Sequence, residues 1–132
     1  MTLDGLPLEN TLHTTLGMEI LEARPDCVRI RMPVGPRVHQ PYGILHGGAS
    51  VALAESAASL AAALNVDRTT QWAVGLEINA NHLRSVRDGN VTAEALPIHR
   101  GRSTHVWEVK IRDDAGRLVC ISRCTVAIVP KR

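Results

Sequence analysis

The sequence predicts an α+β domain in which an antiparallel sheet packs against a single long helix. Residues 48–64 form a continuous Ala-rich run that is typical of a helix, and the segments around it alternate apolar and polar residues as half-buried strands do. Short turn signals such as Asp88-Gly89 separate the later strands, which favours antiparallel neighbours joined by hairpins. The chain has 132 residues, so we expect one domain over residues 1–132.

The expected elements follow one another with short connections. Two strands come first, and in the second of them Val28, Ile30 and Met32 alternate with arginines. Prolines make residues 33–41 irregular, and the helix follows. Tight turns then join four more strands. The six strands are expected over residues 16–23, 27–34, 73–85, 90–99, 103–112 and 117–129.

Aromatic residues are scarce, which limits the possible partners. Phe is absent, and the aromatic residues are Tyr42, Trp72 and Trp107. The core must therefore consist of Leu, Val, Ile and Ala, and base-stacking surfaces for single-stranded nucleic acid are excluded. The net charge is +2, with no long basic block, which argues against binding to duplex nucleic acid. We expect no nucleic-acid partner.

The cysteines and the beginning of the sequence point to a reducing compartment. The three cysteines form no CxxC pair, and Cys120 and Cys124 lie about 13 Å apart along one strand, too far for a disulfide. Residues 1–10 lack a charged segment followed by an apolar one, so no signal peptide is predicted. The helix is too short and too polar to span a membrane. We expect a cytoplasmic protein with no membrane partner.

The helix carries one ionisable side chain, Glu55, between Gly48 and Leu64. A helix that is apolar on all sides is enclosed, so we expect the sheet on one side and a second subunit on the other. A lone carboxylate in such a helix is a functional-site candidate, and Ser59 lies one turn further along the same face. The alternatives are that Glu55 reaches solvent through a gap and that Ser59 is a small packing residue.

The start of the helix is the second candidate. Gly47 and Gly48 lie in its first turn, where backbone N–H groups lack helical partners and another group can approach closely. The Gly47 N–H can therefore polarise a carbonyl, although a plain helix cap is the alternative. Gly47 and Glu55 are separated by about 12 Å along the axis, so both can act on one carbonyl only if they come from different chains. This site predicts a dimer with antiparallel helices.

The run from Gln40 to Ser56, with His46-Gly47-Gly48 followed by Glu55, resembles the signature of hotdog-fold acyl-CoA thioesterases. The resemblance covers nearly the whole chain, including residues 74–82, 101–109 and 117–120. It is strongest to the phenylacetate-degradation (PaaI) type within the 4-hydroxybenzoyl-CoA thioesterase superfamily. Within that branch, the chain resembles bacterial 1,4-dihydroxy-2-naphthoyl-CoA hydrolases and the proofreading thioesterases of the enterobactin pathway.

This resemblance implies a six-stranded antiparallel sheet wrapped around one long central helix, assembled as a dimer and commonly as a dimer of dimers. It implies hydrolysis of an acyl-CoA, with an aromatic acyl group favoured, in which CoA is part of the substrate and no cofactor is needed. Glu55 would be the nucleophile or general base, and Gly47 would polarise the thioester. The remaining implied catalytic residues are His46, Gln40 and Ser59. The implied CoA-binding residues are His82, Arg84, Arg100, Gly101, Arg102 and Ser103.

The chemistry of such a site requires no metal, because a helix N-terminus and one carboxylate supply both carbonyl polarisation and an activated oxygen. The six histidines show neither HxxxH nor HExxH spacing. Two other functions are open. A hotdog dehydratase of 3-hydroxyacyl thioesters would resemble a different motif, with His-Phe-Pro, that this chain lacks. A non-catalytic acyl-CoA-binding protein would keep the fold without the carboxylate.

Overall fold

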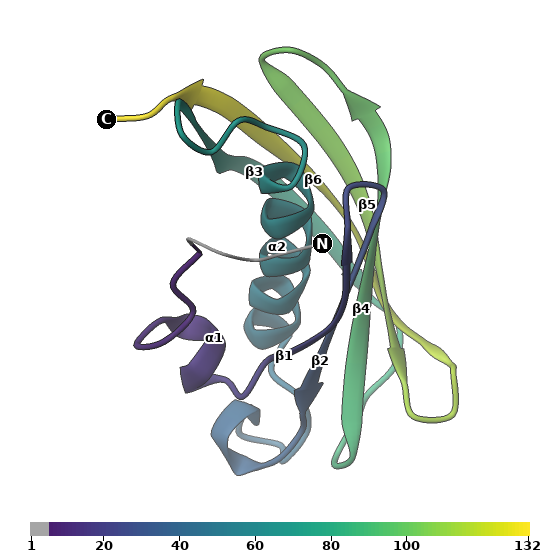
Figure 1. Ribbon diagram of the computed structural model, residues 1–132. Helices are drawn as coiled ribbons and strands as arrows, with labels where there is room; N and C mark the ends of the chain where they lie inside the picture. Colours follow the sequence, from purple (N-terminus) through teal and green to yellow (C-terminus); the bar gives the residue numbers. More distant parts are fainter. Residues whose placement is uncertain (1–5) are drawn as a thin grey trace.

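Six antiparallel strands form one curved sheet, and the long helix α2 lies across its concave face (Figure 1). The computed structural model describes residues 6–132. The helical elements are α1 (Leu12–Thr15), the 3-10 turn η1 (Pro36–Val38) and α2 (Gly47–Ala63). The strands are β1 (Glu19–Arg24), β2 (Cys27–Pro33), β3 (Gln71–His82), β4 (Asn90–Arg100), β5 (Thr104–Asp113) and β6 (Leu118–Pro130). The sheet order β1-β2-β4-β5-β6-β3 places β1 and β3 at the two edges.

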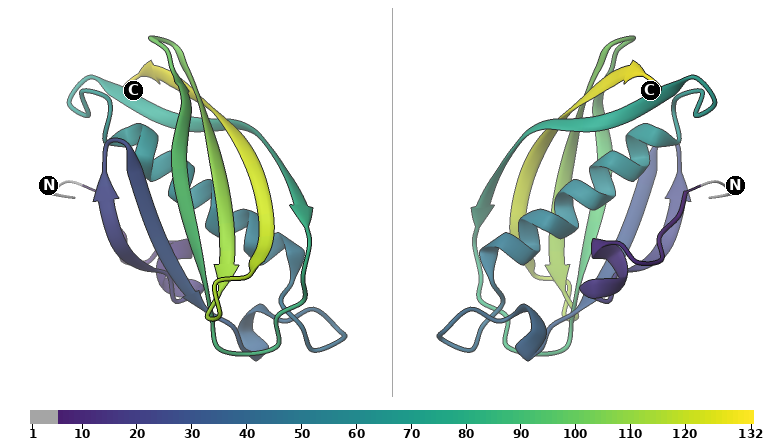
Figure 2. Two further views of the ribbon diagram at one scale, coloured as in Figure 1. Left: turned by 90° about the vertical axis from the view of Figure 1, so that its right-hand side faces the viewer. Right: turned by 90° about the vertical axis from the view of Figure 1, so that its left-hand side faces the viewer.

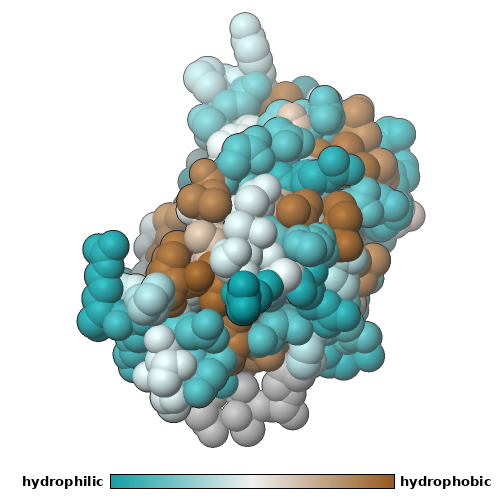
Figure 3. Space-filling view, turned by 90° about the horizontal axis from the view of Figure 1, so that it is seen from above, coloured by the Kyte–Doolittle hydropathy of each residue, from teal (hydrophilic) through white to brown (hydrophobic). Residues whose placement is uncertain are grey.

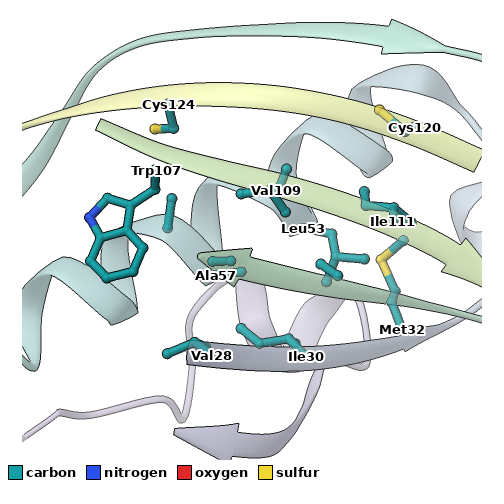
Figure 4. Close-up of a cluster of buried hydrophobic side chains, with 14 of the residues drawn as sticks. Val28, Ile30, Met32, Leu53, Ala57, Trp107, Val109, Ile111, Cys120 and Cys124 are labelled. Carbon is teal, nitrogen blue, oxygen red and sulfur yellow. The ribbon is translucent and has the colours of Figure 1, made fainter. Parts of the chain in front are cut away.

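The core lies between α2 and the sheet, and small helix residues bring the two layers close together. Leu53 and Ala57 of α2 are fully buried, and the helix contacts all six strands. Figure 4 shows them beside the buried side chains of the strands. The fully buried strand residues among them include Val28, Ile30, Met32, Trp107, Val109 and Ile111. The α+β architecture with an antiparallel sheet around one long helix is therefore confirmed.

Strand β5 shows why the predicted alternation was correct. His105, Trp107, Val109 and Ile111 are buried, as the alternating pattern indicates for the residues that face the helix. The Trp107 Nε1–H donates to Nδ1 of His105 at 3.3 Å, which satisfies the polar atom of a fully buried indole. Burial, together with the positive charge of Arg100, lowers the pKa of His105, so the ring is neutral and can accept this bond.

The largest difference between the predicted and observed elements lies at the beginning of the chain. Residues 16–23 were expected to form the first strand, but β1 begins only at Glu19 and the helical turn α1 precedes it. Gly17 adopts a positive φ of 71°, and the N–H of Met18 donates to the carbonyl of His13 at 2.8 Å. These two features close a turn before the strand, and a residue other than glycine would be strained at this φ.

The other boundaries match expectation or differ from it by one to three residues. The helix begins at Gly47 rather than Gly48, because the preceding His46 is the N-cap and its side chain accepts from the N–H of Gly48. Strand β3 covers Gln71–His82 rather than residues 73–85. The three cysteines are buried and free, as predicted, and burial raises the pKa of each thiol. No helix within residues 6–132 is both long and apolar enough to cross a membrane.

One face of α2 is left uncovered by its own chain. The sheet covers the face that carries Leu53, Ala54, Ala57 and Ala61. The right-hand view of Figure 2 shows the opposite side of the helix, with α1 beside it. The residues of this side are only partly buried: Ala52, Glu55, Ser56, Ser59 and Ala63. The sheet therefore encloses the helix on one side, and the segment that leads into α1 covers the other side only in part.

Candidate active site

The entry of the chain into α2 is held by backbone hydrogen bonds. The N–H of Leu45 donates to the carbonyl of Val86 at 2.8 Å, and the N–H of His46 donates to that of Val38 at 2.8 Å. His46 then caps the helix, because its Nδ1 accepts from the N–H of Gly48 at 2.7 Å. In the neutral ring the proton is therefore on Nε2, which makes no hydrogen bond among residues 6–132.

Gly47 is the first residue of α2, and its N–H has no helical acceptor. Within residues 6–132, no other hydrogen bond uses this N–H either. A Cβ on Gly47 would lie 2.9 Å from Nε2 of His82, so only glycine leaves room for that ring at the start of the helix. The Gly47 N–H is thus a free donor at the positive end of a seventeen-residue helix.

Four of the predicted site residues meet around this donor. Gln40, Gly47, His82 and Arg84 line one cavity of about 360 Å³. The side-chain oxygen of Gln40 accepts from the backbone N–H of Tyr42, which orients the amide within its loop. Its NH₂ group has no acceptor in the part of the chain that the structure describes, so this donor faces no competing internal bond.

Glu55 and Ser59 lie elsewhere, on the uncovered face of α2. Both line a second cavity of about 490 Å³, and the chain leading into α1 forms much of its opposite wall. Glu55 is half-buried. Ser59 follows one turn later on the same face, so its hydroxyl can hold a water molecule beside the carboxylate. The two residues are brought together as the sequence suggested.

A glycine in the neighbouring edge strand makes room for the Glu55 carboxylate. A Cβ built on Gly75 would overlap Oε2 of Glu55. The pairing of β3 with β6 shifts by one residue between Gly75 and Glu77, which is a bulge that displaces Leu76 outward. Gly75 is not among the site residues predicted from the sequence. A lone glycine inside a strand is the signal for such a close approach.

The thiols near this site cannot replace Glu55 as the reactive group. Cys124 is fully buried beneath the helix. Burial raises its pKa to about 12, and the nearby carboxylates of Glu55 and Glu77 add to this effect. The thiol is therefore protonated at neutral pH and is not nucleophilic. The carboxylate of Glu55 is the one acidic side chain that lines this cavity among residues 6–132.

The geometry separates Gly47 from Glu55 within one chain. The two residues line different cavities, and their separation of eight positions corresponds to about 12 Å along the helix. The predicted CoA-binding residues are divided as well. His82 and Arg84 lie near Gly47, whereas residues 100–103 form the turn between β4 and β5 at the opposite end of α2.

Arg100 shows where that turn lies. Its Nη1 donates to the carbonyl of Pro25 at 3.3 Å and to Oδ1 of Asn65, which follows the C-terminus of α2, at 3.4 Å. The N–H of Gly101 donates to the carbonyl of Thr104 at 2.8 Å, so it closes the turn. Arg102 and Ser103 are exposed. Arg100 therefore has a structural contact of its own, while the Arg102 guanidinium is open to a ligand.

Comparison with known proteins supports the class that this fold and helix terminus define, the hotdog thioester hydrolases. The model of the Thioesterase superfamily matches residues 42–120. The 1,4-dihydroxy-2-naphthoyl-CoA hydrolase of Listeria monocytogenes is 50% identical over 121 residues, covering 92% of this chain and 98% of that protein. The proofreading thioesterase EntH of Cronobacter turicensis is 44% identical over 131 residues, covering 98% and 95%.

A solved structure agrees closely with the fold. The thioesterase HI1161 of Haemophilus influenzae has 47% sequence identity and a TM-score of 0.88, over 92% of this chain and 85% of that one. The chain belongs to the thioesterase superfamily. It is therefore an enzyme that hydrolyses thioesters, and the hotdog fold expected from the sequence is confirmed.

Proposed function

We propose that this enzyme hydrolyses an aromatic acyl-CoA to the free acid and CoA, with Glu55 as the nucleophile or general base and the Gly47 N–H as the donor to the thioester oxygen. The observation that carries the proposal is the pair of complementary groups on one helix. One is a carboxylate in a largely apolar cavity, and the other is a free N–H at the helix N-terminus. Thioester hydrolysis needs an activated oxygen and a polarised carbonyl, which these two groups supply.

The site needs two copies of the chain, because Gly47 and Glu55 of one copy lie too far apart. Strand β3 supports such an assembly. It is a twelve-residue edge strand, and its apolar side chains Trp72, Val74 and Leu76 are 41%, 41% and 62% exposed. The end of the molecule at which β3 begins has apolar patches among polar side chains (Figure 3). Long apolar edges of this kind pair readily with another chain.

A twofold axis beside β3 would place the two α2 helices antiparallel and complete two sites. The start of one helix then faces the middle of the other, so Gly47 of one copy approaches Glu55 of its partner. The same arrangement brings the β4–β5 turn of one copy toward the Arg84 end of the other. Arg102 and Arg84 from different copies would then flank the phosphates of one CoA, with His82, Arg100, Gly101 and Ser103 around them.

His46, Gln40 and Ser59 support the reaction in this proposal. The free Nε2–H of His46 and the free NH₂ of Gln40, which both precede Gly47 in the sequence, orient the thioester. Ser59 holds the attacking water beside Glu55. An aromatic acyl group fits the apolar walls of the 490 Å³ cavity and agrees with the aryl-CoA for which the Listeria relative is named.

The test is release of free thiol from a panel of benzoyl-, phenylacetyl-, naphthoyl- and alkanoyl-CoA substrates, together with the mass of the assembly from light scattering. We expect the aryl-CoA substrates to be cleaved with the highest kcat/KM and a mass of at least two copies. A protein that binds CoA esters tightly but cleaves none would instead be a non-catalytic acyl-CoA-binding protein. Cleavage by a monomer would contradict the shared site.

The basic residues give a prediction about KM. We expect Arg84→Ala and Arg102→Ala each to raise the KM for acyl-CoA about tenfold, because each variant loses charge-assisted bonds to phosphate. The matched control is Arg31→Ala, which removes an exposed arginine of β2 that pairs with Glu19. Its KM should stay unchanged. The increases should shrink with acyl-pantetheine substrates that lack the nucleotide, and equal increases for both substrate types would contradict the assignment.

A further inference from the structure

The wall of the Glu55 cavity that faces α2 comes from residues 6–13, ahead of the first strand. Its side chains are mostly apolar: Leu6, Pro7, Leu8 and Leu12. Two polar side chains join them, Thr11 and His13. The Thr11 hydroxyl already donates to the carbonyl of Leu8 at 2.5 Å. This wall, called here the N-terminal wall, therefore has one polar side chain whose hydrogen-bonding capacity is unused.

That side chain is His13. No hydrogen bond among residues 6–132 involves its ring, and its Nδ1 is also shielded from solvent. Burial lowers the pKa of His13, so the ring is neutral at pH 7 and offers one donor and one acceptor. Because Nδ1 is shielded, Nε2 is the ring nitrogen that a group in the cavity can reach, and it has no hydrogen-bond partner among residues 6–132. A substrate in this cavity can therefore supply a partner for Nε2.

The position of the cavity determines which part of the substrate reaches His13. The thioester carbon must lie next to the Glu55 carboxylate for reaction, and its two substituents leave in different directions. The CoA arm is charged and would run toward the basic residues near Gly47 of the partner. The acyl group would then lie in the apolar cavity between α2 and the N-terminal wall. Leu60, Ala63 and Ala73 extend the apolar lining of this cavity.

We propose that His13 is a specificity-determining residue, which selects aromatic acyl groups that carry a hydroxyl over the same groups without one. The proposal rests on the proposed aryl-CoA hydrolysis and names the substrate class within it. A hydroxyl on the ring both donates and accepts, so it can pair with the neutral imidazole in either tautomer. A site built to hydrogen-bond a hydroxyl discriminates strongly against an analogue that lacks it.

The test compares kcat/KM for benzoyl-CoA with that for 2-, 3- and 4-hydroxybenzoyl-CoA. We expect the unmodified enzyme to favour at least one hydroxylated substrate by about tenfold or more. His13→Phe keeps a planar ring without nitrogen and should reduce this preference to below about threefold. His13→Gln should retain part of the preference because its amide also donates and accepts. Thr14→Ala, an exposed neighbour in α1, is the matched control and should leave the preference unchanged.

The possible failures can be told apart. If benzoyl-CoA is cleaved but no hydroxylated substrate is preferred, or if His13→Phe keeps the preference, the assignment of His13 is wrong and aryl-CoA hydrolysis stands. If no aryl-CoA is cleaved, the proposed reaction is wrong. The dissociation constants of the same four acyl-CoA molecules for the unmodified protein and for His13→Phe then decide the assignment of His13. The assignment is overturned if the ratio of the dissociation constant for benzoyl-CoA to that for each hydroxylated acyl-CoA is the same in the two proteins. Circular dichroism confirms that each variant is folded.

Discussion

Replacing Glu55 with glutamine is expected to lower kcat for aryl-CoA hydrolysis by about a thousandfold. The amide is neither a nucleophile nor a base. Loss of a catalytic nucleophile or base lowers the rate of the chemical step by roughly two to four orders of magnitude. The amide has nearly the size of the carboxylate, so the cavity, the dissociation constant for acyl-CoA and the assembly should be preserved. Stopped-flow or steady-state detection of free thiol measures the effect.

The matched control for this variant is Glu94→Gln, on the strand β4 and outside the cavity that holds Glu55. It should have normal turnover. Near-normal activity of Glu55→Gln would rule out the mechanism. A single turnover in ¹⁸O-labelled water then separates the two roles of Glu55. Direct attack by water on the thioester labels the acid product and leaves Glu55 unlabelled. Attack by the carboxylate expels the CoA thiolate and gives an anhydride, and water that opens this anhydride at the Glu55 carbonyl carbon labels Glu55 itself, so label on Glu55 detected by mass spectrometry demonstrates the nucleophilic role.

Replacing Gly75 with alanine is expected to lower kcat about a hundredfold, although Gly75 takes no part in the chemistry. The added methyl group would overlap Oε2 of Glu55, so the carboxylate must move. A displacement of about 1 Å in a reacting group is enough for an effect of this size. KM for acyl-CoA should change little, because the basic residues near Gly47 are not affected.

Gly35→Ala is the control for this change, since a Cβ at Gly35 has no atom within 4 Å and the backbone there is extended, with φ of −164°. It should have normal kcat. Thermal unfolding and light scattering should show that both alanine variants fold and assemble like the unmodified protein. A normal kcat for Gly75→Ala would mean that Glu55 does not act from the position seen against β3.

Local patterns in the sequence predicted the elements that the core depends on. The alternation of residues 105–111 identified the buried side of β5 because a strand in a sheet with one covered face has a strict period of two. The Ala-rich run predicted α2 to within one residue, and its N-cap chemistry explains the difference. The separation of Gly47 and Glu55 also followed from the sequence, since the rise of a helix is constant.

Features that depend on contacts between distant residues were not predicted. The Leu12–Thr15 turn has no helical pattern of its own, and a positive φ at Gly17 ends it. Gly75 and Glu55 are twenty positions apart, and nothing local indicates that a carboxylate fills the space left by the missing side chain. No local sequence pattern distinguishes His13, and its proposed role follows from the cavity that it lines. The assignments of the catalytic and CoA-binding residues stay predictions until the variants are measured.

In the proposed site, the N-terminal wall has an evolutionary consequence, because it separates the choice of substrate from the groups that would carry out the reaction. The N-terminal wall lines the cavity that holds Glu55 yet belongs to no strand of the sheet, and it precedes the helix that carries Glu55 and Gly47. Changes in this short stretch can alter which acyl groups fit without disturbing the packing of α2 on its sheet. Exchange of this stretch between relatives should therefore transfer substrate preference, so that new specificities can arise in this family at little cost in stability.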